Sequence, residues 1–256
     1  MAEKKAIAWR LVAMAFTIAL VAPPLTLAAE LTPAEILDRV DDLFRGSSSH
    51  GRAKMTVRTR NWSRSLVMEF WSEGTDHSLV RILEPKKEKG TATLKSGRDL
   101  WNYLPKVKRV VKLPSSMMSA SWMGSHFSND DLVRDSRMTE DYTFEVTFQG
   151  ARNGDEIVEL TCTPKPEAPV VWGKVVVTVA NDSYMPRTIR YYDEDMDLAR
   201  TLSYHDPKEL GGRTLPVRME MQPIDEPDEI TVVEYEQIEF DIELDDDTFS
   251  LRTLQR

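Results

Sequence analysis

The sequence predicts a mainly β protein, an incomplete antiparallel β-barrel in which a curved sheet of about 10–12 strands is covered by a small helical lid. Three observations carry this prediction. One amphipathic helix follows an apolar leader, more than ten short segments then alternate apolar and polar residues, and a Met- and Trp-containing segment interrupts them. A sheet of this size cannot stay flat and open, so it must curl.

The first 29 residues have the layout of a secretory signal. Three basic residues precede an apolar run from Leu11 to Ala22, and two prolines and the small pair Ala28 and Ala29 follow it. A membrane anchor is the alternative, but about a dozen apolar residues are too few for a bilayer that needs roughly 20. We therefore expect residues 1–29 to be a cleavable signal peptide and residues 30–256 to form a single domain.

Charge and cysteine content exclude several classes of protein. Without residues 1–29 the chain has 30 basic and 41 acidic residues, a net charge of −11. Nucleic-acid binding is therefore not expected. The only cysteine is Cys162, so the chain has no internal disulfide. Its place in the alternating run "IVELTCTP" predicts a buried, unreactive side chain.

Residues 31–44, "LTPAEILDRVDDLF", predict one helix. Thr32 and Glu35 form a capping box, and Gly46 ends the helix. The apolar stripe consists of Ile36, Leu37, Val40, Leu43 and Phe44. This stripe needs a partner surface, which the sheet would provide.

Period-two alternation defines the strands that follow. The runs "RAKMTVRTR" and "SLVMEFW" begin the series, and we expect the apolar sides of both to line the concave face. The residues expected there are Met55, Val57, Leu66, Met68 and Phe70. The later segments are 78–83, 91–94, 100–104, 107–113, 142–148, 157–164, 170–179, 187–192, 198–205, 215–221 and 230–240.

The segment from Ser115 to Asp131, here called the lid segment, places large apolar side chains among serines and acids. They are Met117, Met118, Trp122, Met123 and Phe127. The spacing suits a marginal helix or an ordered loop. One interpretation is a loop that plugs the barrel for stability. The other is a conformable binding surface, because methionine recurs where a surface must repack around variable ligands.

The sequence resembles a known family from the lid segment outward. "WNYLPKVKRVVKLP" followed by "SSMMSASWMGSHFSNDDL" is similar to the signature of the LolA-like outer-membrane lipoprotein-sorting family, and "DDTFSLRTLQR" resembles its C-terminal element. His126 departs from the pattern, since this branch usually has an acid there. The resemblance implies a periplasmic carrier of lipids or lipidated proteins, with an inner-membrane exporter of the resistance-nodulation-division or ATP-driven type as partner.

Two further groups of residues complete the expected binding site. Trp101 and Tyr103 share one face of a strand that leads into the lid segment, where they would flank the cavity or fill a core. Lys106, Lys108 and Arg109 lie in a basic stretch, where they would meet anionic headgroups or a donor complex during transient membrane contact. We expect the carrier to be a monomer. A lipid-sensing regulator of the RseB type is the alternative function.

The motifs of an enzyme or a metalloprotein are missing from the sequence. "MGSHF" lacks the second glycine of a nucleophile elbow, so Ser125, His126 and Asp130 are not expected to be catalytic. The four histidines are scattered, and no pair has the spacing of a zinc-binding helix. We therefore expect no catalytic residues, no metal site and no cofactor.

Overall fold

The structure is a computed structural model that describes residues 31–134, 138–168 and 170–256. The expected signal peptide lies outside the described residues. Residues 31–256 form one compact unit. None of the helices in the described part combines the length and the apolar character needed to cross a bilayer.

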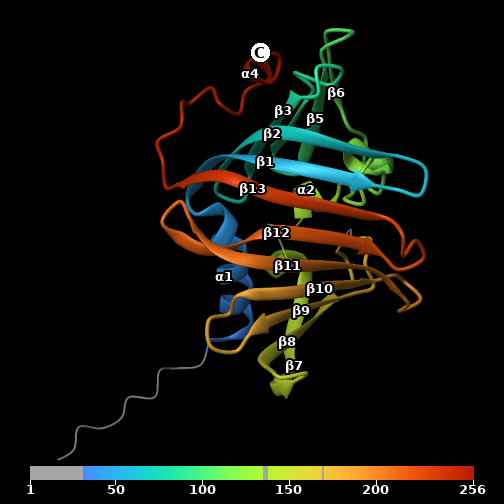
Figure 1. Cartoon of the computed structure of the whole chain (residues 1–256), viewed down its shortest axis with the longest axis vertical. Coiled ribbons are helices and arrows are strands. Elements are labelled where there is room, and N and C mark those ends of the chain that lie inside the picture. The colour runs from blue at the N-terminus through green and yellow to red at the C-terminus, as the bar shows by residue number, and fades with distance from the viewer. Residues whose placement is uncertain (1–30, 135–137, 169) are drawn as a thin grey trace, which may run out of the picture. The chain divides into compact units, whose positions relative to one another are not determined.

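The core of this unit is one antiparallel sheet of 13 strands, ordered β6-β5-β4-β3-β2-β1-β13-β12-β11-β10-β9-β8-β7 (Figure 1). Strands that are neighbours in sequence pair with each other, except β6 and β7, which form the two edges, and β1 pairs in addition with β13. The strands are β1 (Ser48–Arg58), β2 (Ser63–Glu73), β3 (His77–Glu84), β4 (Ala92–Ser96), β5 (Asp99–Leu104), β6 (Arg109–Lys112), β7 (Tyr142–Arg152), β8 (Asp155–Pro164), β9 (Lys174–Ala180), β10 (Pro186–Tyr192), β11 (Leu198–Leu210), β12 (Arg213–Pro223) and β13 (Ile230–Phe240).

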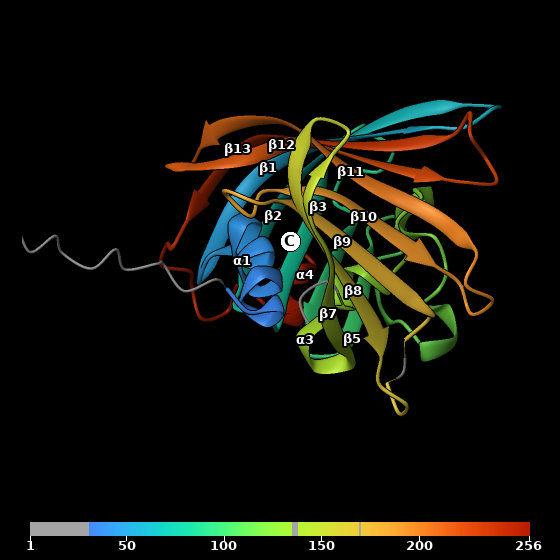
Figure 2. The same cartoon turned by 90° about the horizontal axis from the view of Figure 1, so that it is seen from below.

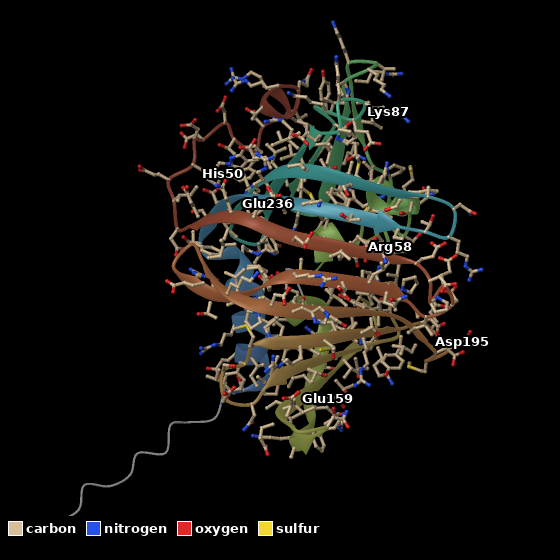
Figure 3. The ribbon with its side chains drawn as sticks, in the orientation of Figure 1. His50, Arg58, Lys87, Glu159, Asp195 and Glu236 are labelled. Carbon is tan, nitrogen blue, oxygen red and sulfur yellow. The ribbon has the colours of Figure 1, made fainter. Side chains whose placement is uncertain are left out.

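The sheet is curved and unclosed, as its size requires, and has one strand more than the upper end of the expected range. Figure 2 shows the strands bending around α1 (Pro33–Arg45). Register shifts such as the one between Arg52 and Ala53 add local bends. The outer face carries ion pairs, among them Arg52 with Glu236 at 3.0 Å and Arg190 with Glu159 at 2.6 Å. Figure 3 labels Glu236 and Glu159.

Helix α1 covers part of the inner face, as its stripe predicts. Thr32 and Glu35 form the expected capping box. Ile36, Leu37 and Val40 pack against apolar residues of β8 to β12 in the main core cluster. The helix begins the compact unit and is held there by apolar burial.

The lid segment belongs to the connection between the two edge strands, β6 and β7. It contains two short 3₁₀ turns, η1 (Ser115–Met117) and η2 (Trp122–Gly124), and leads into α2 (Asp131–Arg134) and α3 (Met138–Asp141). It is therefore an ordered loop, and the helical alternative with one continuous stripe is wrong. Because it joins opposite edges of a curved sheet, it must cross the hollow side.

The C-terminal segment covers a different surface. Helix α4 (Leu251–Leu254) packs Leu254, which is fully buried, against Leu79 and Leu94 of β3 and β4. Arg81 donates to the Thr253 carbonyl at 2.6 Å and helps to hold this segment. This packing covers the face of β3 to β5 opposite the cavity.

Candidate functional site

A cavity of about 600 Å³ lies between the concave face, α1 and the lid segment. Its volume is within the usual range of about 300–1,000 Å³ for small-molecule sites. The strands contribute its apolar floor, and α1, the lid segment and α3 contribute its cover. Among the apolar lining residues are Leu37, Val40, Phe44, Ala53, Met55, Met68, Phe70, Val80, Trp122, Phe127, Leu132, Met138, Val177, Ile189, Leu202, Tyr204, Met219, Val233 and Tyr235.

Four aromatic rings form one wall of this cavity. Phe44 of α1 stacks on Tyr235 with ring centroids 5.6 Å apart and lies 5.9 Å from Tyr204. Phe70 meets Tyr235 edge to face at 5.6 Å. The Phe70 ring occupies space beside Gly51, its partner on β1, where a Cβ atom would lie 2.4 Å from the ring. The wall therefore depends on a glycine opposite an aromatic residue.

A row of paired residues leads from the cavity to the sheet edge. The cross-strand pairs are Phe70 with Val80, Val80 with Thr93, Thr93 with Asn102, and Asn102 with Val111. Directly opposed residues point to the same face of a sheet. The row therefore runs on the concave face from the cavity-lining Phe70 to the exposed Val111 on edge strand β6.

The lid segment is anchored by polar contacts. The Trp122 indole N–H donates to Thr93 Oγ1 at 3.1 Å. Arg200 of β11 donates to Asp131 Oδ1 at 2.5 Å and to the His126 carbonyl at 2.9 Å. Trp122 is 6% exposed and still lines the cavity. The segment thus combines an apolar surface toward the cavity with fixed attachments on both sides.

Five of the residues expected to bind lipid do line the cavity. They are Met55, Met68, Phe70, Trp122 and Phe127. Val57 and Leu66 are fully buried in the same apolar cluster as Met55, but they do not reach the cavity surface. Alternation showed that these residues share one face of their strands, whereas the curvature of the sheet decides which of them reach the cavity.

Trp101 and Tyr103 lie on the opposite face, and their expected place beside the cavity is wrong. Both pack against Leu94 and Leu254 under the C-terminal segment. The alternate residue Asn102 points to the concave side instead. The sequence pattern showed that Trp101 and Tyr103 share a face but could not show which face is concave.

Three methionines of the lid segment also lie away from the cavity. Met117 is 49% exposed, and Met118 packs against Leu100 and Leu113 near the sheet edge. Met123 adopts a left-handed backbone conformation and contacts the edge of the Trp122 cluster without lining the cavity. The 3₁₀ turns break the helical stripe, so these side chains point in different directions.

Lys106, Lys108 and Arg109 are exposed at the β5–β6 hairpin. The neighbouring β3–β4 loop carries Lys86, Lys87 and Lys89, also exposed, and its Gly90 would place a Cβ 3.7 Å from Pro105 of the hairpin. Figure 3 labels Lys87 at the end of the sheet where β5 and β6 lie. The two loops together form a basic surface, here called the basic tip.

The exposed part of the cavity lining is acidic. It includes Asp38, Asp41 and Asp42 of α1 and Glu140 of α3. Arg45 is the basic residue among these lining groups and pairs with Asp41 at 3.0 Å. Arg213 pairs with Asp42 at 3.3 Å and Arg98 with Glu140 at 3.8 Å, so ion pairs offset much of this negative charge.

The side chains of Ser125 and His126 make separate contacts. Ser125 Oγ donates to the Trp122 carbonyl at 2.7 Å, while His126 Nδ1 lies 2.8 Å from Thr231 Oγ1. These bonds organise the lid segment and do not align a nucleophile with a base.

Comparisons with known proteins agree with this architecture. A family model described as "Uncharacterized protein" matches residues 74–256. The crystal structure of a LolA superfamily protein from Nitrosomonas europaea is 23% identical and superposes with a TM-score of 0.74, covering 87% of this chain and 99% of that one. The chain belongs to the family that this model describes, and its fold is that of a LolA superfamily protein.

Two more crystal structures share the fold of this LolA-like protein. A DUF1329 family protein from Desulfovibrio piger is 23% identical with a TM-score of 0.77, covering 86% of this chain and 96% of that one. A domain from Vibrio parahaemolyticus described as an outer membrane lipoprotein-sorting protein is 24% identical with a TM-score of 0.74, covering 87% and 97%. The comparison with curated proteins finds no match.

Sequence reasoning missed several residues of the LolA-like cavity. Tyr204 and Tyr235 complete its aromatic wall, and both lie in segments that alternation identified as strands. Asp38 and Asp41 of α1 border the cavity as well, although neither belongs to the apolar stripe of the helix. Only the curvature of the sheet brings these residues together with Met55 and Phe70.

Proposed function

We propose that this protein is a periplasmic carrier that shelters an acyl chain of a lipid or lipoprotein in its cavity and moves it between the inner and outer membranes. The observation that carries the proposal is the apolar hollow of about 600 Å³ under the lid segment. The LolA-like fold and the likeness to a lipoprotein-sorting domain support it. The carrier performs no covalent chemistry, and an inner-membrane exporter would supply its cargo.

Energetics favour an enclosed site over a surface groove. Exposing an acyl chain to water costs about 0.8 kcal/mol of free energy for each methylene. A 16-carbon chain therefore needs roughly 12 kcal/mol of stabilisation from its carrier. A cavity with an apolar floor and cover can supply much of this by removing the chain from water. The polar end of the cargo would lie at the border formed by Asp38, Asp42 and Glu140.

The basic tip is suited to transient contact with an anionic membrane. Three apolar residues are exposed in the β5–β6 hairpin: Leu104 (42%), Val107 (59%) and Val111 (43%). Around them the basic tip carries five lysines and one arginine. Lysine is depleted in protein interfaces, whereas lysine clusters suit fluid anionic headgroups. The row of paired residues that ends at Val111 connects this surface to the cavity along the concave face of the sheet.

A cavity-filling substitution tests the carrier function. Val80→Phe places a larger side chain in the cavity, and Val146→Phe is the matched control because Val146 is 42% exposed on edge strand β7. We expect Val80→Phe to weaken binding of a neutral pyrene-labelled alkyl amide at least tenfold and Val146→Phe to leave it unchanged. Equal binding by both variants would refute the cavity as the cargo site.

The same probe separates a carrier from a sensor. A carrier accelerates transfer of the labelled chain from donor to acceptor vesicles, whereas an RseB-type sensor binds the chain without moving it. We expect transfer by the wild-type protein and none by Val80→Phe. A carboxylate version of the probe should bind more weakly than the amide, because an apolar cavity removes its charge from water.

Flotation with vesicles tests the basic tip. Lys106→Gln with Lys108→Gln removes two of its charges, and Arg187→Gln with Lys208→Gln removes two exposed charges elsewhere. At about 1 kcal/mol per charge, the first pair should lose roughly thirty-fold in partitioning to phosphatidylglycerol vesicles at low salt. If the wild-type protein does not bind these vesicles, the basic tip contacts a protein partner instead of a membrane.

A further inference from the structure

Three potential metal ligands meet outside the cavity, beside the lid segment. His126 belongs to the lid segment, while Glu226 and Glu229 belong to the loop between β12 and β13. One ligand atom from each of the three side chains lies within 4.8 Å of the others. The cluster joins two segments about a hundred residues apart, so no local spacing in the sequence signals it.

The histidine ring is held in a defined orientation. Its Nδ1 lies 2.8 Å from Thr231 Oγ1, and the same hydroxyl accepts the His126 backbone N–H at 3.0 Å. This leaves Nε2 facing Glu229. Metal-binding histidines are typically oriented by a hydrogen bond at the second ring nitrogen. Thr231 is fully buried and occupies that position here.

The two carboxylates are also placed by their surroundings. Glu229 accepts the Arg60 backbone N–H at 3.1 Å, and this bond, with the contact to His126, lowers the pKa of Glu229. The Gln222 side-chain amide donates to the backbone carbonyls of Pro227 at 3.0 Å and Glu229 at 2.8 Å. These bonds give the loop that carries both acids a fixed backbone.

The spacing within the cluster fits a shared ion. His126 Nε2 and Glu229 Oε2 lie 3.4 Å apart, which is long for a charge-assisted hydrogen bond of about 2.7–2.9 Å. Two ligands that each lie about 2.0–2.1 Å from a tetrahedral zinc ion are separated by about 3.4 Å. Glu226 is exposed and could complete the set of three protein ligands by adjusting its side chain.

We propose that His126, Glu226 and Glu229 bind one divalent transition-metal ion of the zinc type, which ties the lid segment to the β12–β13 loop. An imidazole nitrogen with two carboxylates suits zinc, and such a set is a poor site for magnesium, which prefers oxygen ligands alone. The bound ion would restrain the lid beside Phe127, which lines the cavity. This inference is independent of the proposed cargo.

Titration calorimetry with zinc chloride on tag-free protein tests the proposal, together with metal analysis after dialysis. We expect one zinc ion per chain, a raised midpoint of thermal unfolding in zinc, and no response to magnesium. Glu226→Gln should lose at least tenfold in zinc affinity and keep its metal-free thermal midpoint, since Glu226 is exposed. Thr231→Val, which removes the orienting hydroxyl, should lose about 10–100-fold.

The matched control is one of the other histidine–glutamate pairs, the one on β11 and β12. His205 Nε2 lies 3.6 Å from Glu220 Oε2, and among the described residues no third ligand is grouped with them. His205→Gln should keep the wild-type zinc affinity, whereas His126→Gln should lose binding. The proposal is overturned if wild-type protein binds no zinc, or if Glu226→Gln and His126→Gln bind it as the wild type does.

Discussion

The Trp122 indole N–H donates to Thr93 Oγ1 at 3.1 Å, and both side chains are buried. This hydrogen bond joins the lid segment to β4. Thr93 Oγ1 in turn donates to Asn102 Oδ1 at 2.8 Å. The cavity cover is thus attached to the sheet through a polar group in an otherwise apolar region.

Replacing Thr93 with valine should lower the free energy of unfolding by about 1–3 kcal/mol, because a buried indole N–H loses its acceptor. Urea denaturation provides the measurement. Thr56→Val is the control, since its hydroxyl bonds Ser65 Oγ in an exposed environment and its loss should change stability by less than about 0.5 kcal/mol. Equal effects of the two substitutions would show that the Trp122 contact contributes little.

A second prediction concerns the buried ion pair of Arg200 and Asp131. The Arg200 guanidinium lies 4.5 Å from the ring centroids of both Trp172 and Tyr191, and its charge is met by Asp131. Arg200→Met should destabilise the protein by about 3–5 kcal/mol, because it leaves a buried carboxylate without its cation.

Removing both charges distinguishes the contribution of the ion pair to stability from the contribution of side-chain packing. The double variant Arg200→Met with Asp131→Asn should recover much of the lost stability in thermal or urea unfolding, since no unpaired charge remains. Arg190→Met is a surface comparison, because Glu159 keeps a second partner, Arg152, and the expected loss is about 0–1 kcal/mol. A double variant as unstable as Arg200→Met would contradict this account.

Gly51 should resist even a small side chain. A Cβ at this position would lie 2.4 Å from both Phe70 Cζ and the Gln237 carbonyl oxygen. Gly51→Ala should therefore cost about 1–3 kcal/mol and displace the Phe70 ring into the cavity, which weakens binding of the alkyl probe. Gly51→Ala with Phe70→Leu should regain part of the stability. Unchanged stability and binding in Gly51→Ala would show that the wall adjusts freely.

Cys162 should be inert in the folded protein. Its side chain is fully buried, and burial raises the pKa of the thiol from 9.0 to about 12. The reactive thiolate is thus suppressed by roughly a thousand-fold at pH 8, in addition to the loss of access. A thiol reagent such as Ellman's reagent should react with one equivalent only after denaturation in urea. Rapid labelling of the native protein would indicate local opening around β8.

Strand and helix positions follow from local patterns. The capping box of Thr32 and Glu35 predicts where α1 begins, and alternation predicts all strands of the sheet, although β9 begins at Lys174, several residues later than expected. These features depend on residues close together in the chain. They suffice to predict the class of fold, and the motif in the lid segment indicates the resemblance to the LolA-like family.

The face on which each residue lies requires the curvature. Met55 and Trp101 belong to equally clear alternating patterns, yet Met55 lines the cavity and Trp101 packs under the C-terminal segment. An alternating pattern looks the same whichever face is buried. The sequence by itself therefore shows which residues share a face of a strand, but it does not show which face is concave.

Local sequence thus determined the elements, their order and the apolar segment that covers the hollow. Tertiary structure alone decided the cavity and its acidic border, the attachment of Trp122 to Thr93, and the meeting of His126 with Glu229. The physical reason is that β1 and β13, which lie far apart in the sequence, pair in the middle of the sheet. That pairing and the bend of the sheet bring together residues that no short-range pattern relates.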